Sequence, residues 1–249
     1  MKRLLITGLN GTVAPVVANL FKNKGWDIIA WDRSLADPEN TTQSAAFFDQ
    51  YSPDAVCHLA MGSESWAGWL AEKTKQKSIP YLFTSTAMVF ANKPNGPFTI
   101  DRDRTANEQY GQYKIRCEDR IWQHNPDAMI ARLGWQIGET AGGNNMLEHC
   151  HQQMQQNNAI EASTRWFPAC SLIRVTAQII YQLIERNEPG LYHIDSNTEE
   201  KLSFYELLQK LNQHHNAQWL INSSEAFEYD QRLLDNRIKV PSISASLEC

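Results

Sequence analysis

The chain has 249 residues, of which 42% are hydrophobic and 20% charged, and its formal net charge is −5. These values are typical of a folded globular protein and exclude a disordered chain, and the acidic balance gives no reason to expect binding to nucleic acid. No run of about 18 apolar residues occurs, so we expect no membrane partner. The opening residues MKRLLI resemble a signal peptide, but glycines follow, so we interpret them as a strand and the protein as cytoplasmic.

The cysteines give no sign of a disulfide framework or of a metal site. Their number is odd, their spacing is irregular and no CxxC pair occurs, so neither paired cysteines nor a zinc knuckle is predicted. They are Cys57, Cys117, Cys150, Cys170 and Cys249. The sequence HCH at 149–151 invites a metal interpretation, but adjacent residues of a helix point in different directions and cannot share one ion. We therefore expect no metal.

The first half of the chain alternates short apolar runs with amphipathic segments. Strands are predicted at 2–7, 27–31, 54–60 and 81–85, and helices at 13–24 and 66–76. Such uniformly apolar strands are typical of a parallel sheet that helices cover on both faces. With right-handed crossovers, this β-α-β-α-β order predicts an α/β fold with a Rossmann-type doubly wound parallel sheet.

The second half continues this pattern and then becomes more polar. Helices are predicted at 107–124, 148–158, 172–186 and 202–213, strands at 128–133 and 190–195, and a loop at 134–145. Ser203 and Glu206 have the spacing of a capping box at the start of the last helix. We predict a NAD(P)-binding Rossmann domain at 1–135, to which 168–186 returns. A small C-terminal α/β substrate-binding region is predicted at 136–167 and 187–249.

The turn after the first strand reads TGLNGTVA, a GxxGxxA pattern placed between a strand and a helix. Gly8 permits a tight turn, Gly11 lets the backbone approach a pyrophosphate, and Ala14 lets the helix pack closely on the strand. The start of the helix offers N–H groups and a positive dipole end to the phosphates. We therefore predict a dinucleotide site with contacts from Gly8, Asn10, Gly11 and Thr12.

The end of the second strand bears on the choice of cofactor. A carboxylate at Asp32 can accept hydrogen bonds from both ribose hydroxyls of the adenosine half, which favours NAD. Arg33 follows directly and could instead pair with a 2′-phosphate, which would favour NADP. Because Asp32 would repel that phosphate, NAD is slightly preferred and NADP stays open.

Tyr110 and Lys114 lie four residues apart in EQYGQYKIRCE and so share one face of the predicted helix. One interpretation is a solvated pair on the helix surface. The other is catalytic, because reduction of a ketone leaves negative charge on an oxygen that needs a proton and a stabilising donor. A phenol with a pKa near 10 is a reluctant acid at neutral pH, so we expect Lys114 to lower the pKa of Tyr110.

With a strand–GxxGxxA–helix unit followed about 100 residues later by YxxxK, the chain resembles the extended short-chain dehydrogenase/reductase family. The segment FTSTAMVFANKPNGPFTIDRD at 83–103 and the following YGQYK are similar to the matching segments of dTDP-4-dehydrorhamnose reductases. Weaker matches are HLA at 58–60, ARLGWQIG at 131–138 and GLYHID…LSFYEL at 190–208. The similarity covers nearly the whole chain.

This resemblance implies an NAD(P)-dependent oxidoreductase that reduces a keto group of a nucleotide-linked deoxy sugar. Tyr110 would be the general acid, Lys114 would also hold the nicotinamide ribose, and the hydroxyl of Thr86 would bridge to the substrate oxygen. The remaining implied cofactor contacts are Leu59, Ala60 and Ser85, which also lies beside the substrate. The implied substrate contacts are Trp135, Arg165 and Trp166.

Some residues depart from the family pattern. Ala87 and Met88 replace an Asp-Tyr pair near the substrate, and the segment 62–80 is shorter than the family's, where it usually helps to form a dimer. A homodimer therefore stays open. The alternative function is a non-catalytic NAD(P)-binding regulatory or sugar-nucleotide-binding protein of the same fold, as the methionine adenosyltransferase β subunit is. Retention of Thr86, Tyr110 and Lys114 counts against that alternative.

Overall fold

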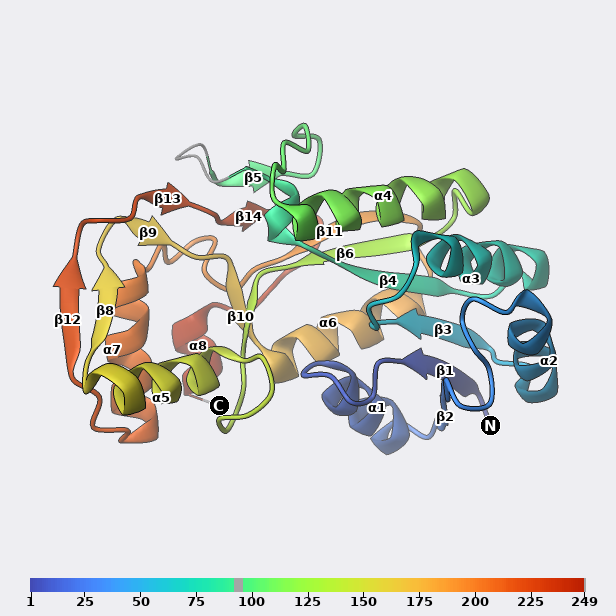
Figure 1. Ribbon diagram of the computed structural model, residues 1–249, viewed down its shortest axis with the longest axis horizontal. Coiled ribbons are helices and arrows are strands. Elements are labelled where there is room, and N and C mark those ends of the chain that lie inside the picture. The colour runs from blue at the N-terminus through green and yellow to red at the C-terminus, as the bar shows by residue number, and fades with distance from the viewer. Residues whose placement is uncertain (92–95, 249) are drawn as a thin grey trace. The chain divides into compact units, whose positions relative to one another are not determined.

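The computed structural model describes residues 1–91 and 96–248 (Figure 1). Cys249 and residues 92–95 of the family-like segment lie outside this part. The chain forms two compact units. Unit 1 comprises Met1–Ser85, Gln109–Ala131 and Ala177–Tyr192, and unit 2 comprises Thr86–Glu108, Arg132–Thr176 and His193–Cys249. Within the described residues, no helix combines the length and apolar character needed to cross a membrane.

The central sheet, most of which belongs to unit 1, has six strands. They are β1 (Arg3–Thr7), β2 (Asp27–Ala30), β3 (Ala55–His58), β4 (Tyr81–Thr86), β6 (Met129–Leu133) and β11 (Gly190–Ile194). Their order is β11-β6-β4-β3-β1-β2, and β1 is parallel to both β2 and β3. Because β2 and β3 lie on opposite sides of β1, the order reverses there, and ligands of such sheets bind beyond the carboxyl ends of the strands at this point. The predicted doubly wound α/β fold is confirmed.

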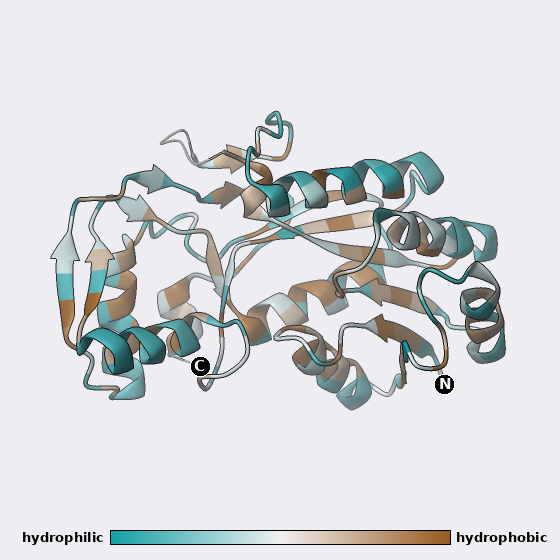
Figure 2. Ribbon diagram, in the orientation of Figure 1, coloured by the Kyte–Doolittle hydropathy of each residue, from teal (hydrophilic) through white to brown (hydrophobic). Residues whose placement is uncertain are grey.

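Five helices flank the sheet: α1 (Ala14–Asn23), α2 (Thr41–Tyr51), α3 (Glu64–Lys77), α4 (Gln109–His124) and α6 (Ile173–Arg186). Helices α1 and α6 lie on one face and α3 and α4 on the other (Figure 1). The rings of Phe21 and Tyr181 join α1 to α6 with centroids 5.0 Å apart. On the opposite face, Phe48, Trp66 and Ile121 bring α2, α3 and α4 into one buried cluster with the strands. The strands of this sheet are mainly hydrophobic, and polar residues colour the outer turns of the helices (Figure 2).

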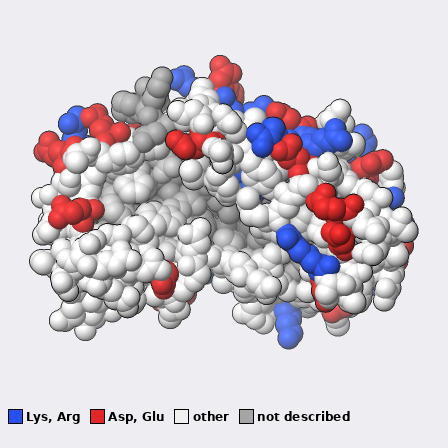
Figure 3. Space-filling model, viewed as in Figure 1, with Lys and Arg blue, Asp and Glu red and all other residues white. Residues whose placement is uncertain are grey.

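The outer surface of α3 and α4 is charged. Acidic and basic side chains alternate over these two helices on the face shown in Figure 3. Arg116 Nε donates to Glu64 Oε1 at 2.5 Å, which links the start of α3 to the middle of α4. An exposed pair of this kind contributes little to stability, so the apolar cluster beneath is what holds the two helices on the sheet.

In its described residues, unit 2 contains short strands and three α-helices. The helices are α5 (Met146–Asn157), α7 (Phe204–His215) and α8 (Ile243–Leu247), and η1 (Ala87–Val89) is a single 3₁₀ turn. The strands are β5 (Phe98–Thr99), β7 (Trp135–Ile137), β8 (Ile160–Ser163), β9 (Trp166–Phe167), β10 (Cys170–Leu172), β12 (Ile221–Ser224), β13 (Tyr229–Asp230) and β14 (Leu233–Leu234). They form the parallel pairs β10-β7, β12-β8, β13-β9 and β14-β5.

The predicted elements agree with the structure to within about two residues at each end, and both hydrogen bonds of the Ser203–Glu206 capping box are present. Several short elements of unit 2 and one helix of unit 1 were not predicted, and one local prediction was wrong. The helix is α2, whose apolar side chains are few, although its Asn40 cap accepts hydrogen bonds from Thr42 N and Gln43 N. Residues 135–137, assigned to a loop, form β7, because the distant strand β10 supplies its hydrogen bonds.

The two units begin and end at residues other than those of the predicted domains. Residues 86–108 belong to unit 2, and most of α6 together with 187–192 belongs to unit 1. Each unit is assembled from segments far apart in the sequence, so its limits depend on tertiary contacts. That unit 1 binds the cofactor and unit 2 the substrate remains a prediction.

Candidate active site

The glycine turn between β1 and α1 leaves little space for a side chain at two positions. Gly8 has φ +86°, and a Cβ there would lie 3.0 Å from Ala60 N and Cα. Gly11 N donates to Gly8 O at 2.8 Å, and a Cβ at Gly11 would lie 3.1 Å from that oxygen. Pro15 then starts α1 without needing a hydrogen-bond acceptor for its nitrogen. Asn10 and Thr12 lie on the same turn. Its shape fits the pyrophosphate of a dinucleotide.

The turn after β3 lies against this glycine turn. Thr7 Oγ1 accepts hydrogen bonds from Leu59 N and Ala60 N, both at 3.0 Å. Their N–H groups are therefore used within the protein. A cofactor at this turn would meet only the carbonyl groups and side-chain atoms of Leu59 and Ala60.

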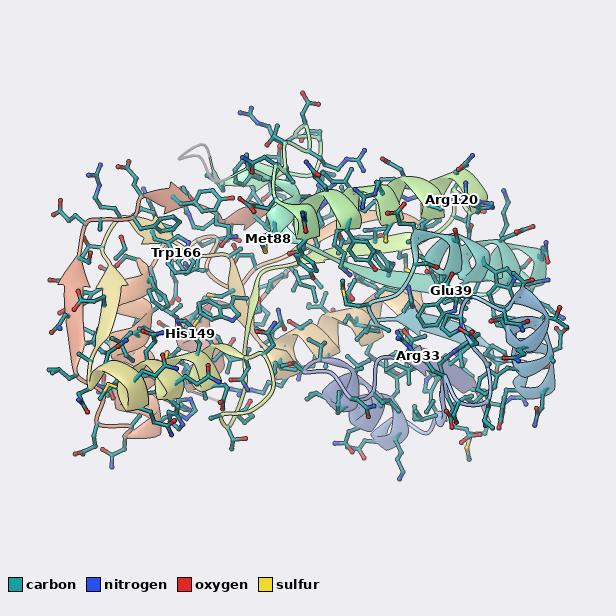
Figure 4. The ribbon with its side chains drawn as sticks, in the orientation of Figure 1. Arg33, Glu39, Met88, Arg120, His149 and Trp166 are labelled. Carbon is teal, nitrogen blue, oxygen red and sulfur yellow. The ribbon has the colours of Figure 1, made fainter. Side chains whose placement is uncertain are left out.

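Asp32 and Arg33, at the end of β2, are both held by neighbouring groups. Asp32 Oδ1 accepts from Ser34 Oγ at 2.6 Å and from Ser34 N at 2.8 Å, and these two bonds lower the pKa of Asp32. Arg33 Nη2 donates to the carbonyl of Met61, and its guanidinium lies 5.4 Å from the ring centroid of Trp66. In Figure 4, Arg33 is accordingly directed toward the loop that precedes α3. Asp32 therefore stays ionised at neutral pH, and the guanidinium of Arg33 is held by Met61 and Trp66.

Lys114 is buried on α4, with only 3% of its surface exposed. Its Nζ donates to Thr84 O at 2.8 Å and lies 4.5 Å from the ring centroid of Phe83. Burial lowers the pKa of Lys114 to about 8, although the electrostatic effects of Cys117 and Glu118 oppose this shift. The ammonium is therefore still largely protonated at pH 7.

Tyr110 lies one turn before Lys114, and 39% of its surface is exposed. The Lys114 ammonium is 5.9 Å from the ring centroid of Tyr110. The predicted lowering of the Tyr110 pKa is wrong, because burial of the remaining surface raises that pKa and Cys117 raises it further. Lys114 donates to a backbone carbonyl and does not offset this effect. A raised pKa keeps the phenol protonated, as a proton donor requires.

Ser85 and Thr86 end β4. Ser85 Oγ is buried and has no hydrogen-bond partner among the described residues, so it is available to a ligand. Thr86 is 8% exposed, and its Oγ1 accepts from Met88 N at 3.2 Å, which caps η1. Thr86 belongs to unit 2, whereas Tyr110 and Lys114 belong to unit 1. The joint role of these three residues stays a prediction from the sequence.

The predicted substrate contacts of unit 2 meet in an aromatic cluster. The ring centroids of Trp135 and Trp166 are 6.2 Å apart, and Phe204 lies within 6.0 Å of both. His149 adds a ring 5.2 Å from Trp135, and Figure 4 shows how His149 and Trp166 lie within unit 2. Buried Trp166 Nε1 has no partner in the described part of the chain. Arg165, by contrast, forms an ion pair with Glu228, so its charge is partly compensated.

Several residues of the site were not identified from the sequence. Tyr113 donates its hydroxyl to Gly62 O at 2.8 Å and accepts from Gly62 N at 3.2 Å, which attaches α4 to the loop after β3. An open groove of about 510 Å³ adjoins it in unit 1. The groove is lined by Met61, Gln109, Tyr110, Gln112, Tyr113 and Arg116. The sequence offered only one indication of this role, the position of Tyr113 within YGQYK, because its partner Gly62 is distant in the sequence.

The sheet order, the glycine turn and the Tyr110–Lys114 pair define an extended short-chain dehydrogenase/reductase. A family model described as the RmlD substrate binding domain matches residues 1–231. The chain belongs to this family.

Two relatives of known name are similar to the chain. The spore coat polysaccharide biosynthesis protein SpsK of Bacillus subtilis (strain 168) is 21% identical over 213 residues, which are 79% of this chain and 74% of SpsK. The probable low-salt glycan biosynthesis reductase Agl14 of Haloferax volcanii is 26% identical over 159 residues, which are 53% of each chain.

Solved structures share the fold. The crystal structure of dTDP-4-dehydrorhamnose reductase from Bacillus anthracis in complex with NADP superposes with a TM-score of 0.84 at 18% identity, covering 100% of this chain and 98% of that one. The enzyme WbmH of Bordetella bronchiseptica in complex with NAD⁺ gives a TM-score of 0.73 at 18% identity, covering 94% and 89%. At this identity the likeness establishes the fold alone.

Proposed function

We propose that the protein is an NAD(P)-dependent reductase that acts on a keto group of a nucleotide-linked deoxy sugar. The observation that carries the proposal is buried Lys114, one helical turn from Tyr110 and bonded to Thr84 O near the end of β4. Burial of an ammonium costs free energy, so a buried lysine at such a position is a candidate functional residue. The glycine turn that fits a pyrophosphate belongs to the same unit. The names of the curated relatives also point to glycan biosynthesis.

When bound, a nicotinamide cofactor supplies the hydride that reduces the ketone. The turn from Gly8 to Thr12, together with the positive end of the α1 dipole, would hold the pyrophosphate. The hydroxyl of Tyr110 would donate its proton to the developing alkoxide, and the charge of Lys114 would stabilise the phenolate that remains. Ser85 Oγ would donate a hydrogen bond to the same oxygen, and the hydroxyl of Thr86 is proposed as a further substrate contact.

We assign NADH as the preferred form of the cofactor. The ionised Asp32 carboxylate suits the two hydroxyls of an unmodified ribose and repels a 2′-phosphate. Arg33 is close enough to compete for this role, but Trp66 and the Met61 carbonyl already bind its guanidinium. Solved structures of similar fold contain either cofactor form, so the fold does not decide between them.

The sugar end of the substrate is assigned to unit 2. Trp135 and Trp166 present stacked aromatic surface, which suits a nucleobase or the apolar face of a deoxy sugar. Arg165 is the proposed partner of the diphosphate, and to bind it must exchange Glu228 for the ligand.

The test is to mix the protein with NADH or NADPH and a panel of dTDP-linked 4-keto-6-deoxy sugars and to follow absorbance of the reduced nicotinamide. Consumption of NADH that depends on the sugar is the expected result. Binding of the cofactor without turnover on the whole panel would contradict the reductase and support the non-catalytic alternative. That alternative draws its support from Ala87 and Met88, which lack the polar groups of the family at this position.

A further inference from the structure

His58, the last residue of β3, is a buried histidine that the proposed chemistry does not use. Its side chain is 1% exposed, and Nδ1 lies 2.9 Å from Thr7 Oγ1. That hydroxyl already accepts the N–H groups of Leu59 and Ala60. A hydroxyl has two lone pairs and one proton, so Thr7 must donate its proton to His58 Nδ1. The imidazole of His58 is therefore neutral and carries its own proton on Nε2.

The surroundings of His58 keep it in that state. Nε2 has no hydrogen-bond partner within the described residues, and aromatic rings enclose the imidazole. The ring of Trp66 meets it edge-on with centroids 4.6 Å apart, and Phe83 stacks on it at 5.4 Å. Burial, together with the positive charges of Lys114 and Arg33, lowers the pKa of His58 to about 3. His58 does not gain a charge between pH 5 and 8.

The same two rings also contact two cations of unit 1. Lys114 Nζ, assigned to the cofactor, lies over Phe83, 4.5 Å from the ring centroid. The guanidinium of Arg33, which follows Asp32 in the chain, lies over Trp66 at 5.4 Å. His58 therefore contacts one ring that packs against Lys114 and another that packs against Arg33.

We propose that His58 is a positioning residue for the dinucleotide, acting through Thr7 on the turn after β3 and through Phe83 and Trp66 on Lys114 and Arg33. This inference rests on the proposed cofactor binding. The tolerance at the turn is small, since a Cβ at Gly8 would lie only 3.0 Å from Ala60 N and Cα, closer than an ordinary contact. If the Thr7 hydroxyl lost its acceptor, it would turn away and leave the buried N–H of Ala60 without its bond. The turn after β3, and with it the glycine turn that packs against it, would then shift.

The experiment measures the NADH dissociation constant by fluorescence for wild type, Thr7→Val, His58→Phe and the double variant. We expect each single change to weaken binding about 5- to 20-fold, as loss of one buried hydrogen bond does. Because both changes break the same bond, the double variant should lose no more than either single one. Thr7→Ser keeps the hydroxyl and His58→Asn keeps an acceptor near Nδ1, so both should stay within about 3-fold of wild type.

Thr74→Val is the matched control. Thr74 is also a fully buried threonine of unit 1; its single hydroxyl proton is shared between Leu70 O and Ala71 O within α3, and its oxygen accepts from Asn125 Nδ2. It should lower thermal stability without changing NADH affinity. Unchanged affinity in Thr7→Val and His58→Phe, or additive losses, would overturn the role of His58.

Two further results separate this inference from the proposed function. If wild type binds neither NADH nor NADPH, the cofactor proposal fails and the role of His58 fails with it. Nitrogen-15 NMR of the histidines reports the tautomer without any cofactor. We expect His58 to stay neutral with its proton on Nε2 from pH 5.5 to 8, whereas a proton on Nδ1 would overturn the hydrogen-bond assignment even in a protein that binds NADH.

Discussion

Tyr110 keeps part of its ring in solvent, whereas Lys114 is buried beneath the same helix face. The difference suits their proposed roles, because the proton donor must reach a substrate while the ammonium needs only to act through space on the phenolate. The raised pKa of Tyr110 means that the free enzyme holds this proton firmly at neutral pH. Negative charge would then develop on the phenol only during the reaction.

At Tyr110 we expect the Phe substitution to reduce turnover by at least about 1000-fold, because it removes the proposed proton donor and a large share of the charge stabilisation. NADH affinity should change by less than about 2-fold, since the ring remains. Steady-state kinetics and fluorescence titration measure the two effects. Retained turnover in Tyr110→Phe would remove this residue from the mechanism.

The charge of Lys114 predicts an alkaline limit of activity. Its pKa in the folded chain is lowered to about 8, so the charge is complete well below that pH and is lost as pH rises through it. We expect kcat/KM to fall above about pH 8. Lys114→Arg should move this fall to higher pH, because a guanidinium keeps its proton. A pH profile that is the same in wild type and Lys114→Arg would contradict the assignment.

At the scale of elements, the glycine turn joins β1 to α1 at a position set by the turn after β3. The chain supplies a matched pair of glycines to test this. Gly8 and Gly25 both have φ +86°, but a Cβ at Gly8 would meet Ala60, whereas one at Gly25 would meet nothing within 4 Å. An alanine at either position would therefore have the same backbone strain, but only an alanine at Gly8 would meet a neighbouring residue.

Alanine at either glycine should lower the free energy of unfolding by about 1 kcal/mol through the positive φ. Only Gly8→Ala should also weaken NADH binding, by about 10-fold or more, because the turn must move away from Ala60. Chemical denaturation and NADH titration check the two expectations. Equal NADH affinity in Gly8→Ala and Gly25→Ala would show that the turn does not hold the pyrophosphate.

At the scale of the whole molecule, two units of similar size are each assembled from three chain segments. The residues proposed to bind or position the cofactor, namely the glycine turn, Asp32, Lys114 and His58, all belong to unit 1. We therefore expect cofactor binding to be measurable without any substrate. The aromatic cluster around Trp135 and Trp166 belongs to unit 2 and does not enter this measurement.

NADH should stabilise the whole protein against heat, because a ligand that binds only the folded state shifts unfolding by mass action. At about 100 times its dissociation constant, the gain is about 2.7 kcal/mol. Thermal unfolding with equal concentrations of NADH and NADPH should show the larger shift for NADH. A larger shift for NADPH would favour Arg33 as the residue that decides the cofactor, and no shift with either would contradict the cofactor site.

The local features of this protein follow from its amino-acid sequence. The glycine turn, the apolar strands, the Ser203 capping box and the spacing of Tyr110 and Lys114 depend on residues within a few positions of one another, and such short-range patterns can be recognised directly. They were sufficient for the α/β fold class and for the cofactor and catalytic candidates. Helix α2 was not predicted, because Phe47 and Phe48 are its only large buried side chains and give little periodicity.

How these residues are held depends on contacts that form when the chain folds. The contact of Arg33 with Trp66, the acceptor for Thr7 at His58 and the stacking of Trp135 on Trp166 all join residues far apart in the chain. The direction of the Tyr110 pKa shift was wrongly predicted for the same reason, since it depends on how much of the ring the fold buries. Burial and long-range hydrogen bonds are properties of the folded chain, and spacing along the sequence does not contain them.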